Sequence, residues 1–179
     1  MRRLADWSST VQPRRVLGID TGFAHIGYAL IEVDDFARQT LVDYGVWDMH
    51  SAYERMNERS VHAMRQLNTI LDKLKFDGIV LETVPGGKTK FNAKDATLAT
   101  TNFFRSYCII HGLDYAEAMS RTFKTFVTGS STASKDDMKA AAIARFPELP
   151  DDLRYDAYDA VCIAVRGATP GYERWGYAR

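Results

Sequence analysis

The chain has 179 residues, of which 46% are apolar and 26% charged, a composition typical of one globular domain. It contains no run of 18 apolar residues, so we expect no membrane span, and its basic first residues lack the apolar core of a secretion signal. The two cysteines, Cys108 and Cys162, lie in apolar helical segments, which favours buried, reduced thiols in a cytoplasm over disulfides.

Net charge is zero, but the charges are unevenly distributed along the chain. Residues 86–145 contain nine Lys and Arg against five Asp and Glu, whereas both flanks are acidic. A basic centre between acidic flanks suits a chain that grips phosphates in one region and holds metal ions in the others. An ordinary solvated surface would show the same imbalance, so charge alone leaves both interpretations open.

The first half of the chain is predicted to be mostly strand. Three consecutive strands are expected at residues 16–20, about 26–33 and about 40–47, with a turn marked by Asp34-Asp35 before the third. A helix over about 52–75 and a fourth strand over 78–82 follow. The next segment, 85–90, is a Gly- and Lys-rich loop.

The second half alternates helices with one strand. A helix is expected over about 94–111, and a short strand over about 114–118. Ser134-Lys135-Asp136-Asp137 opens a further helix that ends near 146, and the last helix covers about 153–167. That helix carries a stripe of small apolar residues, so we expect it to lie close to the sheet. Successive strands followed by alternating elements are typical of a mixed α/β fold.

Four carboxylates stand where a metal-dependent nuclease needs them. Asp20 and Glu82 each end an apolar run that is predicted to be a buried strand. Asp156 and Asp159 are three residues apart in the last helix, so they share one face. Carboxylate oxygens suit Mg²⁺, and two such ions about 3.5–4 Å apart can hold the attacking and leaving oxygens of a phosphodiester.

The acids belong to motifs that occur in a fixed order. Val16-Leu17-Gly18-Ile19-Asp20-x-Gly22 and Ile79-Val80-Leu81-Glu82-Thr83-Val84 contain the strand acids. Phe123-Lys124-x-x-Val127-Thr128-Gly129 precedes Ala133-Ser134-Lys135, and Asp156-x-x-Asp159-Ala160 comes last. In sequence, order and spacing these motifs resemble those of the RuvC family of Holliday junction resolvases. The resemblance covers residues from about 16 to 167.

The resemblance implies a ribonuclease-H-like fold, with a mixed five-stranded sheet and helices on both faces. It divides the chain into an N-terminal arm (1–15), a nuclease domain (16–167) and a C-terminal tail (168–179). It also implies two Mg²⁺ (or Mn²⁺) ions per active site. Asp20 would bridge the two ions, Glu82 would hold one, and Asp156 with Asp159 would hold the other.

The same resemblance implies DNA-binding residues. A basic residue near the leaving oxygen would be Lys124 or Lys135, and the two remain equal candidates. The phosphate contacts are predicted at Lys88, Lys90, Lys94, Arg121, Lys124 and Lys135.

In the family, an aromatic residue directly after the glutamate strand inserts into the junction centre, but Pro85 occupies that place here. An insertion over 85–90 would displace this wedge to Phe91. The alternative is that Phe91 packs beneath its own helix. His25, beside the predicted metal turn, is either a phosphate contact or a plain loop histidine.

A four-way junction has two-fold symmetry, so we expect a C₂ homodimer that cuts two opposed strands. The helix at 52–75 or the one at 94–111 would carry the interface. Phe103, Phe104 and Tyr107 are candidates for it, with core packing as the alternative.

Other functions remain open at the sequence level. The nearest alternative is a related nuclease for flaps, forks or RNA–DNA hybrids, because the acids do not choose between these substrates. A non-catalytic junction-binding module is a second alternative, and an ATPase or sugar-kinase-like domain is a third. We expect action in the cytoplasm of a bacterial cell or of a phage-infected host. Neither the sequence preference of cleavage nor any branch-migration partner is predicted.

Overall fold

One mixed sheet forms the middle layer of the computed structural model, which describes residues 14–22, 24–48, 64–65, 67–83, 91–170 and 175–176, without the side chains of 83, 91–96 and 175–176. The strands lie in the order β3-β2-β1-β4-β5-β6. Their bounds are β1 (Arg14–Asp20), β2 (His25–Val33), β3 (Gln39–Asp48), β4 (Gly78–Thr83), β5 (Asp114–Met119) and β6 (Trp175–Gly176). Strand β1 is antiparallel to β2, and β2 is antiparallel to β3. Strands β1, β4 and β5 are parallel to one another, so their carboxyl ends meet at one edge of the sheet.

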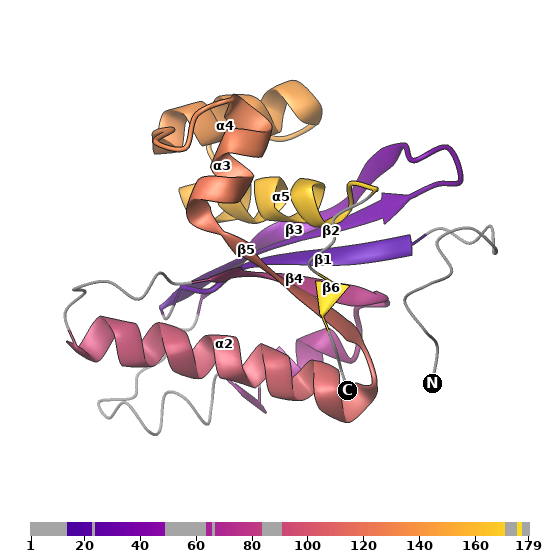
Figure 1. The fold of residues 1–179 in the computed structure, drawn as a ribbon, viewed down its shortest axis with the longest axis vertical. Coiled ribbons are helices and arrows are strands. Elements are labelled where there is room, and N and C mark those ends of the chain that lie inside the picture. Colours follow the sequence, from indigo (N-terminus) through magenta and orange to yellow (C-terminus); the bar gives the residue numbers. More distant parts are fainter. Residues whose placement is uncertain are drawn as a thin grey trace.

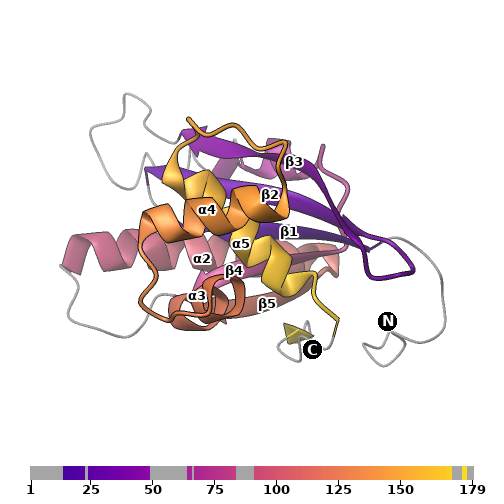
Figure 2. The same cartoon turned by 90° about the horizontal axis from the view of Figure 1, so that it is seen from above.

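Helices cover both faces of this sheet, as Figures 1 and 2 show. Their bounds are α2 (Phe91–His111), α3 (Ser120–Thr128), α4 (Lys135–Arg145) and α5 (Tyr155–Gly167). Helix α2 lies on one face, whereas α5 lies across the other with α3 and α4 beside it (Figure 1). None of the helices within the described ranges is long and apolar enough to cross a membrane.

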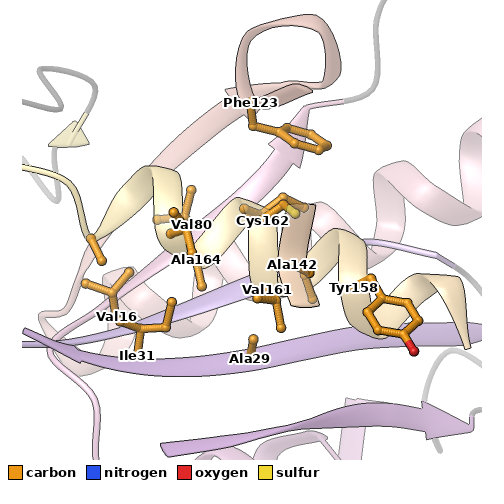
Figure 3. Close-up of a cluster of buried hydrophobic side chains, with 14 of the residues drawn as sticks. Val16, Ala29, Ile31, Val80, Phe123, Ala142, Tyr158, Val161, Cys162 and Ala164 are labelled. Atoms are coloured by element: carbon orange, nitrogen blue, oxygen red, sulfur yellow. The ribbon is translucent and has the colours of Figure 1, made fainter. Parts of the chain in front are cut away.

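Alternation along the strands divides the core into two clusters. On the α2 face, Leu17 and Ile19 of β1 pack with Ile79 and Leu81 of β4 and with Phe104 of α2. On the α5 face, Val16 and Val80 pack with Ala29 and Ile31 of β2 and with small residues of α5 (Figure 3). Successive strand side chains point to opposite faces, so the residues that follow Ile19 and Leu81 point toward α5.

Helix α5 packs closely on the sheet because its contact face and the strands below it carry small residues. The predicted stripe is confirmed: Ala157, Ala160, Val161, Ala164 and Val165 are all buried. A Cβ at Gly18 of β1 would stand 2.6 Å from the carbonyl oxygen of Ala160 and 2.5 Å from the nitrogen of Ala164. A Cβ at Gly27 of β2 would collide with the carbonyl oxygen of Asp156. Glycine at these positions therefore sets the distance between α5 and the sheet.

Most of the predicted elements are confirmed, with boundaries that shift by one to three residues. Asp34 closes the β2–β3 turn, because its Oδ1 accepts hydrogen bonds from the backbone N–H groups of Phe36 (2.9 Å) and Arg38 (2.8 Å). Ser134 caps α4 in a reciprocal pair with Asp137, as the Ser-Lys-Asp-Asp sequence indicated.

Three differences from the predicted elements stand out. The five predicted strands are present, and a two-residue strand, β6, is added at the β5 edge of the sheet within the predicted tail. Helix α3 was not predicted. Of the predicted 52–75 helix, residues 64–65 and 67–71 are helical, 72–75 are not, and 52–63 and 66 lie outside the described residues.

We predict that Gly18→Ala destabilises the protein by about 1–3 kcal/mol, because the added methyl overpacks the β1–α5 contact. Urea unfolding measures the change, with Ser106→Ala on the exposed side of α2 as the control, which should stay within about 0.5 kcal/mol of wild type. Equal stability of Gly18→Ala and wild type would show that α5 does not need this close approach.

Candidate active site

Asp20 and Glu82 stand side by side at the carboxyl ends of two adjacent parallel strands. Asp20 is the last residue of β1, Glu82 is the last but one of β4, and the residues before them, Ile19 and Leu81, are paired in register. Both acids point toward α5, because Ile19 and Leu81 face α2. Their carboxyl groups share a hydrogen bond, so the sheet itself brings two of the four predicted acids together.

The turn after β1 ties the two strand ends to each other. The Gly22 N–H donates to the carbonyl oxygen of Asp20 at 2.9 Å. The buried Thr21 hydroxyl donates to the carbonyl oxygen of Glu82 at 3.4 Å. A Cβ at Gly22 would collide with the carbonyl oxygen of His25, so this tight turn requires glycine. The Asp-x-Gly motif is therefore the structural means of holding Asp20 beside Glu82.

Asp156 and Asp159 reach the strand acids from the first turns of α5. They are one helical turn apart on the face that borders the buried stripe. The carbonyl of Asp156 rests on Gly27 of β2, which fixes this end of the helix on the sheet. Both carboxylates act electrostatically on Asp20, so the four predicted acids form one cluster.

Burial and mutual repulsion make this cluster costly to charge. Burial, followed by the charges of Glu82, Asp159 and Asp156, raises the pKa of Asp20 well above its usual value. Burial also raises the pKa of Asp159 to about 6, against the opposing charges of Lys135 and Lys124. Clustered carboxylates with raised pKa values are typical of functional sites, since a structural role would not require such repulsion.

Lys124 and Lys135 approach the cluster from two different helices. The Lys124 ammonium, on α3, donates to the carbonyl oxygen of Ala133 at 2.8 Å, and this bond holds the α3–α4 connection. Lys135 is the first residue of α4, and its Nζ lies 5.6 Å from the ring centroid of Tyr155. Both charges lower the pKa of Asp159, so the structure brings both predicted lysines to the acids.

The connection between α4 and α5 is held by Tyr158, which lies between the two helix acids in sequence. Its buried hydroxyl donates to the carbonyl oxygen of Pro150 at 2.6 Å and accepts from the Leu153 N–H at 3.2 Å. Lys139 also donates to the carbonyl oxygen of Asp151. These bonds fix the residues that lead into Asp156.

The remaining predicted site residues have mixed outcomes. Arg121 is exposed on α3, so it is available to a phosphate. Lys88 and Lys90 lie outside the described residues, and the side chains of Phe91 and Lys94 are not described. His25 is the first residue of β2 and not a loop histidine, and its Nδ1 lies 3.6 Å from Asp48 Oδ1.

The aromatic residues offered for a dimer interface belong to the core. Phe104 and Tyr107 are buried in the cluster beneath α2, and Phe103 is half-buried against it. The core-packing alternative is therefore confirmed for Phe104 and Tyr107.

Sequence reasoning also missed Arg154, Tyr155 and Tyr158, although these residues lie next to Asp156 in the chain. The sequence contains little indication of their role, because a Tyr or Arg next to an acid is not part of a recognisable motif.

The donor set fits a divalent cation, because four carboxylates provide only the hard oxygen ligands that Mg²⁺ and Mn²⁺ prefer. Among the residues that the structure describes, no three Asp, Glu, His or Cys side chains converge on one point that would hold an ion. Asp20 instead shares a hydrogen bond with Glu82, and Asp156 is bonded to Arg154. The other three acids nevertheless lie close enough to influence the pKa of Asp20.

A mixed sheet with two carboxylates at adjacent strand ends and two more on the helix that crosses them defines a ribonuclease-H-like nuclease. Residues 16–167 match the sequence model of the family described as crossover junction endodeoxyribonuclease RuvC. The chain therefore belongs to the RuvC family.

Relatives and solved structures agree with this assignment. The chain is 29% identical to the Prochlorococcus marinus RuvC over 161 residues, which cover 85% of this chain and 96% of that one. It is 30% identical to a Synechococcus RuvC over 161 residues, with 86% and 97% covered. A solved structure of the T. thermophilus RuvC in complex with a Holliday junction substrate has the same fold. It gives a TM-score of 0.72 at 16% identity and covers 85% of this chain and 91% of that chain.

The raised pKa of Asp159 predicts a pH-dependent effect on stability in EDTA. A group with a higher pKa in the folded state binds its proton more tightly when folded, so its favourable contribution is lost as pH rises through about 6. Asp159→Asn should therefore match wild type near pH 4 and become more stable above pH 6, by on the order of 2 kcal/mol. Thermal unfolding across this pH range measures the difference.

The exposed Asp152→Asn serves as the control for this series. A constant difference between Asp159→Asn and wild type from pH 4 to 8 would contradict the electrostatic description of the cluster.

Proposed function

We propose that this protein is a divalent-metal-dependent endonuclease that resolves four-way DNA junctions by paired cuts in opposed strands. The observation that carries the proposal is the single electrostatic cluster of Asp20, Glu82, Asp156 and Asp159, with Lys124 and Lys135 acting on it from two neighbouring helices. Membership of the RuvC family supports the branched substrate. We further propose that the protein acts in the cytoplasm of a bacterial cell or of a phage-infected host.

The four acids would hold two Mg²⁺ or Mn²⁺ ions. The carboxyl group of Asp20 interacts electrostatically with the other three acids, and this supports a bridging role. Glu82 would hold one ion, and Asp156 with Asp159 the other. When bound, the two ions supply a nucleophilic water and neutralise the charge that builds up on the phosphorus.

The lysines would position the scissile phosphate and offset its charge in the transition state. Lys124 is already held by the carbonyl oxygen of Ala133, so its ammonium needs little reorganisation when substrate binds. Lys135 and the exposed Arg121 would contact phosphates on either side of the cut, which orients the strand without reading its bases. Lys88, Lys90 and Lys94 would extend this contact, and Phe91 would be the wedge at the junction centre.

We propose residues 16–167 as the nuclease domain, with 1–15 as an arm and 168–179 as a tail.

We propose a two-fold symmetric homodimer, because two opposed strands must be cut. Helix α2 offers a surface for it. Leu98 and Ile109 are 49% and 57% exposed, and they lie three helical turns apart on the same face of α2. The neighbouring Ile110 is also exposed, so the outer surface of α2 presents several large apolar side chains to solvent. Such a surface is typical of a protein interface.

Asp20→Asn should abolish cleavage and leave junction binding intact. Loss of an outer-shell partner typically lowers metal affinity or activity 10–100-fold, so loss of a central ligand should lower the cleavage rate by more than about 100-fold. Single-turnover cleavage in Mg²⁺ measures the rate, and a gel-shift assay in Ca²⁺ should give a junction Kd within about 3-fold of wild type.

The exposed Asp152→Asn is the control for this loss of charge, and it should cut as wild type does. Cleavage by Asp20→Asn at the wild-type rate would remove the metal assignment.

Ile109→Lys should weaken dimerisation by at least about 10-fold, because the two-fold axis introduces the charge twice into one interface. Sedimentation equilibrium measures the dimer Kd. Val42→Lys, which adds the same charge at an exposed apolar residue of β3, is the matched control and should leave the dimer unchanged. If Ile109→Lys dimerises as wild type does, the outer face of α2 is not the interface.

A further inference from the structure

Arg154 lies directly before α5 and pairs with one of the proposed metal ligands. Its Nε donates to Asp156 Oδ2 at 3.3 Å. The side chain of Arg154 is 55% exposed, whereas that of Asp156 is 23% exposed, so the guanidinium lies on the solvent side of the acid. Within the described ranges, Arg154 is the one Lys or Arg that donates a hydrogen bond to any of the four acids.

The backbone around this pair is fixed on both sides. The carbonyl oxygen of Arg154 accepts a hydrogen bond from the Ala157 N–H at 3.0 Å, and the carbonyl of Asp156 rests against Gly27. The residues before Arg154 are held by the Tyr158 hydroxyl, which bonds to Pro150 and Leu153. The guanidinium can therefore leave Asp156 by a change of rotamer, without movement of the loop or of the helix.

The other nearby cations are held elsewhere. Lys135 lies over the Tyr155 ring, and Lys124 is bonded to the carbonyl of Ala133. Both act on Asp159, whereas Arg154 pairs with Asp156. Each helix acid thus has its own positively charged neighbours, and the neighbour of Asp156 is exposed and held to the acid by one long hydrogen bond.

The Arg154–Asp156 pair is weak by its geometry. Arg154 is the N-cap residue of α5 and has an extended backbone, so the pair lacks the alignment of an ion pair between successive helical turns. The bond uses Nε alone at a long distance, and ion pairs between partly exposed groups contribute little to stability. A divalent cation on the Asp156 carboxylate would place a second, larger positive charge next to the guanidinium, and this repulsion favours release of Arg154.

We propose that Asp156 exchanges Arg154 for a divalent cation, and that Arg154 then binds a phosphate of the DNA strand at the mouth of the site. A guanidinium is suited to this second role, because its planar fork bonds two phosphate oxygens at once. The binding of Arg154 to DNA rests on the proposed function, whereas the exchange at Asp156 does not. Through this exchange, metal binding and DNA binding would strengthen each other.

The exchange can be observed with Mg²⁺ alone. The Nε–Hε NMR signal of Arg154 is identified by its absence from the spectrum of Arg154→Lys. In wild type it should move on addition of Mg²⁺ toward the position of a solvated guanidinium. In Asp156→Asn it should start near that position and not respond to Mg²⁺. A wild-type signal that stays in place at saturating Mg²⁺ would overturn the exchange.

The second role is tested by junction binding in two media. Arg154→Gln should weaken the junction Kd about 10-fold in Ca²⁺ and less than about 2-fold in EDTA, because the side chain serves DNA only when the cation has displaced it. Arg121→Gln, which removes an exposed charge that no acid of the site holds, should weaken binding by the same factor in both media. Equal factors for Arg154→Gln in Ca²⁺ and EDTA would overturn the second role.

Failure of this inference is separable from failure of the proposed function. Wild-type protein that neither binds nor cuts a junction would refute the proposed function, whatever the NMR signal does. Wild-type protein that cuts junctions, with an Arg154 signal that ignores Mg²⁺, would refute the inference alone.

Discussion

The close approach of α5 to the sheet determines the geometry of the site. Gly18 and Gly27 leave no room for a side chain beneath the helix, so the backbone of α5 rests directly on β1 and β2. This contact brings Asp156 and Asp159 over the carboxyl ends of β1 and β4, where strand alternation has already turned Asp20 and Glu82 toward the same face. A larger residue in this contact would separate the helix acids from the strand acids.

The same packing creates an electrostatic cost that the rest of the site offsets. Burial and like charge raise the pKa values of Asp20 and Asp159, so the cluster favours any cation that can enter it. Helices α3 and α4 pack with α5 in the core cluster on the α5 face. This packing places Lys124 of α3 and Lys135 of α4 near Asp159. Arg154 provides a cation for Asp156 that is exposed enough to be replaced. The stability of the cluster and the metal and phosphate binding proposed for it therefore depend on one set of charges.

Much of this arrangement could be predicted from the sequence, because it follows from strong local patterns. Apolar runs that end in Asp20 and Glu82 have the length of buried strands, and the Ala157 to Val165 stripe has the period of a helix that faces a sheet. Helix α3 was missed because it follows β5 without an intervening turn and its N-cap residue, Met119, provides no side-chain cap. The Arg154–Asp156 pair was not predicted, because an Arg two residues before an acid has no fixed partner in the sequence, and the burial of Phe104 and Tyr107 was one of two alternatives that the sequence left open.

The central claim is that this cluster cuts four-way junctions, and product mapping on a mobile junction tests it most directly. Each of the four strands is labelled in turn, the wild-type protein is added with Mg²⁺, and the cut positions are compared with those on fork, flap and RNA–DNA hybrid substrates. The account predicts paired nicks at symmetry-related positions in two opposed strands of the junction, and none in EDTA. Cuts confined to one strand, or a faster reaction on forks, flaps or hybrids than on the junction, would contradict it.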